Sequence, residues 1–188
     1  AHDERSHARI VSEAAGAKHF EVEFSEQDFF SLLPRVAAAL DDPVADYATL
    51  PTYKLGQKAR EEGLKVVLCG EGGDELFAGY GRYRSATRPW WRGGAKAMRA
   101  RSVLERLDLL REPPHGWRDG IAAAEHLARR ADWSALQQVQ AVDCAEWLPN
   151  DLLIKLDRCL MAHGVEGRTP LLDPAVAEVA FALPDNFK

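Results

Sequence analysis

A short apolar run followed by a glycine-rich acidic loop, within residues 65–83, constrains this chain more than any other stretch. Residues 66–68 (Val-Val-Leu) form a run of the kind that fills a parallel strand buried on both faces. The loop after it contains three glycines, Gly70, Gly72 and Gly73. It also places three carboxylates within one turn of them, those of Glu71, Asp74 and Glu75. Loops at the carboxyl ends of parallel strands bind ligands in open α/β sheets, so the pattern predicts a site here. The alternative is a turn whose acids only cap the next helix.

Hydrophobic periodicity predicts further elements before this loop. Residues 19–24 alternate apolar and charged side chains, which is typical of a strand at a sheet edge. Ser25 with Asp28 resembles a capping box, and Thr49 is placed as the N-cap of a later helix. We expect helices over 5–15, 29–40 and 49–62, and strands over 19–24 and 65–69. This order is an α/β crossover, which predicts parallel pairing with helices covering the sheet.

The composition is that of an ordinary globular domain. With 46% hydrophobic and 28% charged residues, the 188-residue chain can bury one good core. Its formal net charge of −5 argues against wholesale nucleic-acid binding. Because no apolar run is long enough to span a bilayer and no leader opens the chain, we expect a cytoplasmic protein. The three cysteines are far apart, which favours reduced thiols over a disulfide framework or a zinc site.

The middle of the chain is basic and then helical. Residues 82–101 contain seven arginines and lysines and no acid, with Trp90 and Trp91 among them. Such a segment could attract phosphates and stack bases, but charge runs more often cover a solvated surface, and we favour that interpretation. Residues 103–148 show helical spacing without a catalytic constellation, and we interpret their tryptophans as core anchors.

Residues 150–173 carry several charges among apolar residues. The pattern predicts a helix with Lys155, Asp157 and Arg158, then a glycine-containing turn with Glu166 and Arg168. We expect these charges to be buried. Buried charges must be paired, so structural salt bridges, such as Asp157 or Glu166 with Arg168, are an alternative to a functional role.

Three blocks together carry a resemblance to a known family. They are Asp42-Pro43 through Pro51-Thr52-Tyr53, the run from Leu68 to Tyr80, and Asp151-Leu152-Leu153 through Asp157-Arg158, Met161-Ala162, Glu166, Arg168, Pro170 and Leu172-Asp173. In this order they resemble the synthetase domain of glutamine-dependent asparagine synthetases, in the PP-loop ATP pyrophosphatase superfamily. The resemblance implies a partial nucleotide-binding parallel sheet with helices over residues 1–84. A mostly helical part of the same domain would follow over residues 85–188.

The resemblance also implies a two-step ligase reaction that uses ATP and Mg²⁺. Aspartate would react with ATP to give β-aspartyl-AMP, and ammonia, released from glutamine by a glutaminase domain, would displace AMP to form asparagine. Cys69, Gly70, Gly72 and Gly73 would lie against the nucleotide, Glu71 would serve catalysis and Asp74 would help to hold the metal. The remaining cleft candidates are Glu75, Asp157, Arg158, Glu166 and Arg168.

The chain departs from the family pattern in ways that bear on activity. Cys69 replaces the more usual serine, and a buried thiol packs well there. The superfamily's pyrophosphate loop, the glutaminase domain and a downstream catalytic lysine are not found in these residues. We therefore expect a fragment that makes no asparagine alone. Its incomplete sheet should expose apolar surface and unpaired edges, which predicts strand exchange or a homo-oligomer.

Three other functions remain open from the sequence. A related ligase could use another carboxylate acceptor, as in β-lactam- or peptide-forming enzymes, although Glu71 favours asparagine synthesis. An RNA-modifying PP-loop enzyme would use the basic segment and Trp90-Trp91, but the net acidity and the block from Glu166 to Asp173 argue against it. The isolated chain could also be a non-catalytic interaction module. No membrane partner is expected.

Overall fold

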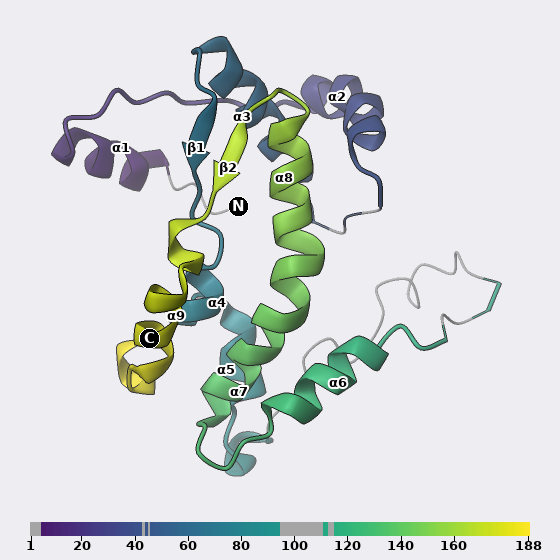
Figure 1. Ribbon diagram of the computed structural model, residues 1–188, viewed down its shortest axis with the longest axis vertical. Coiled ribbons are helices and arrows are strands. Elements are labelled where there is room, and N and C mark those ends of the chain that lie inside the picture. Colours follow the sequence, from purple (N-terminus) through teal and green to yellow (C-terminus); the bar gives the residue numbers. More distant parts are fainter. Residues whose placement is uncertain (1–4, 43, 45, 95–110, 113–114) are drawn as a thin grey trace.

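The computed structural model describes residues 5–42, 44, 46–94, 111–112 and 115–188, and the fold is α/β with a parallel sheet (Figure 1). In chain order the described elements are α1 (Arg5–Ala14), α2 (Glu26–Ala39), α3 (Thr49–Glu61), β1 (Val66–Leu68), α4 (Gly73–Phe77), α5 (Gly81–Ala86), η1 (Trp90–Arg92), α6 (Asp119–Ala128), α7 (Ala135–Val142), η3 (Asp143–Leu153), α8 (Ile154–Met161), β2 (Glu166–Arg168), η4 (Pro170–Leu172), α9 (Pro174–Ala182) and η5 (Asp185–Phe187). Within these residues, none of the helices is both long and apolar enough to cross a lipid bilayer.

The sheet pairs β1 with β2 in parallel, with Val66 opposite Glu166 and Leu68 opposite Arg168. Residues 166–168 therefore form a strand, and the predicted glycine-containing turn is wrong there. The strand depends on Gly167, because α8 packs directly against it. A Cβ at Gly167 would lie 2.7 Å from Leu160 Cδ1, closer than real Cβ contacts come.

The strand predicted over 19–24 is absent, since the described residues 17–25 carry no regular structure. Side chains of two helices hold this segment in place, and strand pairing is absent from it. Arg9 Nη2 of α1 donates to Glu21 Oε2 at 3.0 Å, and Lys54 Nζ of α3 donates to the Glu23 carbonyl at 2.6 Å. Phe24 packs against the buried cluster of α2, α3 and α8, but Phe20 is 43% exposed, and the alternating pattern does not mark a sheet edge.

The cap predicted at the start of α2 is confirmed. Ser25 Oγ accepts from the Asp28 amide at 3.1 Å, and Asp28 Oδ2 accepts from the Ser25 amide at 2.7 Å. Lys54 Nζ also lies 2.7 Å from Asp28 Oδ2. The hydrogen bond from Lys54, followed by those from Ser25, lowers the pKa of Asp28 to about 2. The capping box therefore also connects α2 to α3.

Three clusters of buried residues form the core of the described part of the chain. The first joins α2, α3 and α8 around Val36, Tyr53 and Cys159, and the second joins α5, α6 and α7 around Tyr83 and Val142. The third lies between α8 and the sheet and contains Leu156, Leu160 and Val165. The helical run α7–η3–α8 connects the first two clusters and passes along the length of the molecule (Figure 1). Its middle section, η3, is a π-helix with i→i+5 hydrogen bonds, and it contains Pro149.

One face of the sheet is open. Val66 and Leu68 remain 40% and 73% exposed, although their apolar run predicted a strand buried on both faces. Gly167 faces α8, so the opposite face carries the alternating side chains of β1 and β2. That prediction of burial is therefore wrong for the described residues.

Candidate functional site

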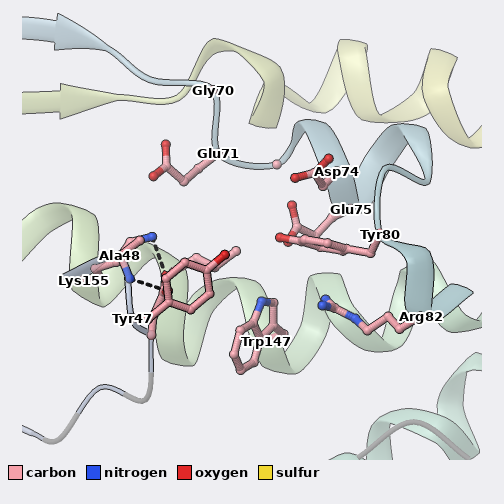
Figure 2. A pocket seen from close by; sticks show the side chains of 13 residues that line it. Tyr47, Ala48, Gly70, Glu71, Asp74, Glu75, Tyr80, Arg82, Trp147 and Lys155 are labelled. Carbon is pink, nitrogen blue, oxygen red and sulfur yellow. Dashed lines mark hydrogen bonds and ion pairs between the residues drawn. The ribbon is translucent and has the colours of Figure 1, made fainter. Parts of the chain in front are cut away.

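A cavity of about 530 Å³ lies beyond the carboxyl end of β1 (Figure 2). Four segments contribute to it: the loop before α3, the loop after β1, the α4–α5 pair, and the η3–α8 run. Its lining residues are Asp46, Tyr47, Ala48, Gly70, Glu71, Gly72, Asp74, Glu75, Tyr80, Arg82, Trp147, Leu152 and Lys155. The glycine-rich acidic loop thus lines a cavity after a parallel strand, and its predicted role as a ligand site stays a prediction.

The turn between β1 and α4 depends on Gly72. Its φ is +93°, in the left-handed region, and it precedes α4 as the N-cap residue. A Cβ here would lie 2.1 Å from Leu172 Cδ2. Two constraints therefore require glycine at this position: the backbone conformation and the contact with the segment after β2.

We expect Gly72→Ala to destabilise the protein by about 2–4 kcal/mol, because it adds left-handed strain and a clash with Leu172. The measurement is urea denaturation followed by circular dichroism. Gly63→Ala is the matched control: its φ is +79° with nothing within 4 Å of the added Cβ, so only the strain of about 1–2 kcal/mol applies. Equal losses in the two variants would show that Leu172 moves aside freely.

Three carboxylates form one wall of the cavity (Figure 2). Glu71 is half-buried in the loop, and Asp74 lies so close to Gly79 that a Cβ there would be 1.8 Å from Asp74 Oδ1. Glu75 is only 1% exposed, and its Oε1 accepts from the Tyr80 hydroxyl at 2.8 Å. Burial, and then the hydrogen bond to Glu75, raises the pKa of Tyr80, so the phenol stays a donor at neutral pH.

The opposite wall holds a buried ion pair that the sequence did not reveal as part of a site. Lys155 Nζ of α8 lies 2.7 Å from Asp46 Oδ2, and the two side chains are only 7% and 10% exposed. The Ala48 amide donates to Asp46 Oδ1 at 2.9 Å. The Thr49 hydroxyl donates to the Asp46 carbonyl at 2.6 Å. Thr49 is the first residue of α3 and Ala48 is its N-cap, so the prediction of Thr49 as the N-cap is wrong. The available signal was Lys155 itself, a charge between two apolar residues.

Arg82 reaches the same wall from α5. Its Nη2 donates to Asp143 Oδ2 at 2.7 Å, and its guanidinium lies 3.7 Å from the centre of the Tyr80 ring. The sequence placed Arg82 in a solvated basic surface, which is wrong for this residue; residues 95–101 of that segment lie outside the described part. Trp147, interpreted as a core anchor, is half-buried and lines the cavity, whereas Tyr47 beside it is 96% exposed.

The other predicted site residues lie near or away from the cavity. Cys69 and Gly73 flank its lining residues in the chain. Arg158 pairs with Asp41 on the exposed side of α8, where Asp157 also lies. Arg168 Nε pairs with Glu166 Oε1 at 2.9 Å, which confirms one predicted salt bridge, but both side chains are exposed.

The prediction that all five charges of this block are buried is therefore correct only for Lys155. Helix α8 is amphipathic, and it turns Lys155 inward but Asp157 and Arg158 outward.

The charge of the cavity favours a cation. Its lining contains four carboxylates and two cations, and each cation, Arg82 and Lys155, is already paired with a carboxylate. Among the described residues, no three His, Cys, Asp or Glu side chains are grouped so that they could hold a metal by themselves. Mg²⁺ takes only one or two carboxylates when phosphate and water supply its other oxygens, so Asp74 with a neighbouring acid fits that ion. Burial, and then the charge of Glu71, raises the pKa of Cys69, which keeps this thiol protonated.

The chain is an α/β domain with a glycine-lined acidic cavity at the carboxyl end of its parallel sheet, the place where open α/β sheets bind ligands. The family model for asparagine synthase matches residues 1–188, and the chain belongs to that family. The resemblance drawn from the three sequence blocks is thereby confirmed, and so is the fold class, a partial PP-loop-like α/β domain with a largely helical C-terminal part.

Individual relatives agree with the family model. A Mycobacterium tuberculosis protein named putative asparagine synthetase (glutamine-hydrolyzing) is 35% identical over 94% of this chain and 33% of its own length. Asparagine synthetase (glutamine-hydrolyzing) 1 of Bacillus subtilis is 30% identical over 96% of this chain and 34% of its own length. The chain thus spans about a third of the length of these relatives.

Proposed function

We propose that this chain forms the acid-lined half of the active site of an ATP-dependent, glutamine-hydrolysing asparagine synthetase. The observation that carries the proposal is the wall of Glu71, Asp74 and Glu75 on a cavity at the carboxyl end of a parallel strand. Family membership and the names of the relatives support the ligase class. The reaction would take place in the cytoplasm, where ATP is supplied.

The proposed reaction has two steps. A side-chain carboxylate oxygen of aspartate attacks the α-phosphorus of ATP, and pyrophosphate leaves as the P–O bond to it breaks. Ammonia, supplied from glutamine by a glutaminase domain, then attacks the acyl carbon of β-aspartyl-AMP, and AMP leaves with the C–O bonding electrons. Glu71 is the base that takes a proton from the attacking nitrogen, because it is a half-buried carboxylate on the cavity wall.

The nucleotide and the metal would meet at the loop after β1. The backbone of residues 69–73 can approach a nucleotide closely because three of its residues are glycines. Asp74, assisted by a neighbouring carboxylate, would hold Mg²⁺, which neutralises charge on the departing pyrophosphate when it is bound. The two positively charged side chains of the cavity lining, Arg82 and Lys155, are each paired with a carboxylate. We therefore propose that residues outside this chain bind the polyphosphate. The 188-residue chain alone would then make no asparagine.

The test is pyrophosphate release from ATP by the complete polypeptide in the presence and absence of aspartate. Release that requires aspartate, with asparagine appearing when ammonia is added, is the expected result. Release that requires a different carboxylate acceptor, or RNA, would contradict the assignment. Asparagine synthesis by the 188-residue chain alone would contradict the incomplete site.

We expect Asp74→Asn to raise the Mg²⁺ concentration needed for half-maximal pyrophosphate release about 10-fold or more, because the amide loses the charge that attracts a hard cation. The measurement is a magnesium titration at fixed ATP. Asp119→Asn, on the first turn of α6 and outside the cavity lining, is the control and should leave the titration unchanged. An unaltered magnesium response in Asp74→Asn would remove this residue from metal binding.

We also propose that the chain self-associates through the open face of β1, where Leu68 is 73% exposed. Leu68→Lys should shift the mass measured by small-angle scattering toward the monomer, because burying a lysine in an apolar contact is unfavourable. Leu127→Lys, an equally exposed leucine at 77% on α6, is the matched control and should leave the mass unchanged. A monodisperse monomer of the unaltered chain would contradict the proposal.

A further inference from the structure

The carboxylate of Glu75 is the end of a connected set of side chains that begins outside the cavity. The set starts at Asp143, whose side chain is fully buried at the start of η3. Arg82 donates both Nε and Nη2 to Asp143 Oδ2, at 3.0 and 2.7 Å. A buried carboxylate requires such a partner, so the ion pair fixes the position of the Arg82 guanidinium.

Arg82 in turn fixes the ring of Tyr80. The guanidinium carbon lies 3.7 Å from the centre of that ring, well within the range of a cation–π contact. The Tyr80 hydroxyl then donates to Glu75 Oε1 at 2.8 Å (Figure 2). The orientation of Glu75 thus depends on a tyrosine held in place by an arginine, and the arginine is held by a buried acid 61 residues away.

The backbone of α4 is held separately from this set. Gln140 of α7 is fully buried, and its Nε2 donates to the carbonyls of Glu75 and Leu76, each at 2.8 Å. Carbonyls in the last turn of a helix lack partners within the helix, so Gln140 satisfies two of them. Loss of the Tyr80 hydroxyl should therefore release the Glu75 side chain without releasing the helix that carries it.

We propose that Glu75 is the second carboxylate, beside Asp74, that holds the cation in this cavity, and that Tyr80 and Arg82 are its positioning residues. The inference rests on the proposed function in that the cation is the magnesium ion of the ligase reaction. Glu75 and Asp74 are neighbours on α4, both line the cavity, and carboxylate oxygen is the ligand type that this ion prefers. Loss of a partner that orients a metal ligand typically lowers metal affinity about 10- to 100-fold.

The experiment measures binding of Mn²⁺ alone to the 188-residue chain by electron paramagnetic resonance of the free ion. Tyr80→Phe should weaken Mn²⁺ binding about 10-fold, as loss of a ligand's hydrogen-bond partner typically does. Glu75→Gln should weaken it at least as much. The double variant should bind Mn²⁺ as Glu75→Gln does, because Tyr80 acts only through Glu75.

Arg82→Lys supplies an independent test. Lysine keeps the charge opposite Asp143 but loses the planar stack, so Mn²⁺ binding should weaken less than in Tyr80→Phe. Arg92→Lys is the matched control, because Arg92 lies over the ring of Trp91 at 4.6 Å outside the cavity lining, and it should change nothing. Circular dichroism verifies that each variant is folded, and if Arg82→Lys does not fold, the Tyr80→Phe comparison decides.

Additive effects of Tyr80→Phe and Glu75→Gln would overturn the inference, as would unchanged Mn²⁺ binding in Tyr80→Phe or no binding by the unaltered chain. These outcomes differ from failure of the proposed function. Pyrophosphate release without aspartate in the complete polypeptide would overturn the reaction but leave the coupled Mn²⁺ result intact. If Tyr80→Phe and Glu75→Gln had additive effects on Mn²⁺ binding while pyrophosphate release still required aspartate, the proposed reaction would stand and the positioning role of Tyr80 would be contradicted.

Discussion

Lys155→Met is expected to lower the free energy of unfolding by about 3–5 kcal/mol, because it leaves the Asp46 carboxylate without its partner on the cavity wall. The side chain of Asp46 is only 10% exposed, so water replaces the lost ammonium poorly. Urea denaturation followed by tryptophan fluorescence measures the loss. Adding Asp46→Asn should recover much of it, because the neutral amide can stay buried at a smaller penalty.

The matched control for this prediction is Lys58→Met on α3. Lys58 Nζ also forms a short contact, 2.6 Å from Glu62 Oε1, but the two side chains are 36% and 28% exposed. Exposed pairs contribute little to stability, so the loss should be far smaller than in Lys155→Met. If the two lysine variants lost equal stability, the importance of burying the Asp46–Lys155 pair would be contradicted.

Glu71→Gln is expected to reduce asparagine formation by the complete polypeptide about 10²–10⁴-fold, the usual contribution of a general base. Glutamine fills the same space and cannot accept the proton from ammonia, so the fold should persist while the amide-forming step fails. The measurement is asparagine formed at saturating ammonia, with circular dichroism to verify folding. Glu178→Gln, an exposed acid on α9, is the control and should leave the rate unchanged. Normal synthesis in Glu71→Gln would exclude Glu71 from the mechanism.

The elements that the sequence predicted correctly have local signals. The capping box of Ser25 and Asp28 begins α2, and the apolar run 66–68 followed by Gly70 gives β1 and its loop. Strand β2 has no such signal, since its middle residue is Gly167 and its partner lies about 100 residues earlier in the chain. The alternating pattern of residues 19–24 led to a wrong prediction of a strand. This segment is held by the ion pair of Arg9 with Glu21 and by the hydrogen bond from Lys54 to the Glu23 carbonyl, and strand pairing is absent from it.

The candidate site divides in the same way. One wall comes from consecutive residues, so the sequence reveals Glu71, Asp74 and Glu75 together. The other wall depends on ion pairs between residues that are far apart in the sequence. Lys155 pairs with Asp46, which lies 109 residues away in the chain, and Arg82 pairs with Asp143, which lies 61 residues away. Charge patterns along the chain contain no information on such pairings, which is why Arg82 resembled a solvated residue.

The π-helix η3 makes the number of residues between 143 and 153 more important for the position of Lys155 than the identity of those residues. Asp143, Trp147 and Lys155, all on the cavity wall or directly behind it, are separated by multiples of four residues. In an α-helix of 3.6 residues per turn, positions 143 and 155 would differ by about 120° in direction, whereas the wider turns of η3 reduce that divergence. Deleting one residue between 143 and 153 would rotate Lys155 away from Asp46 while every cavity side chain remained in the sequence. Natural variants of this segment should therefore tolerate substitution far better than insertion or deletion.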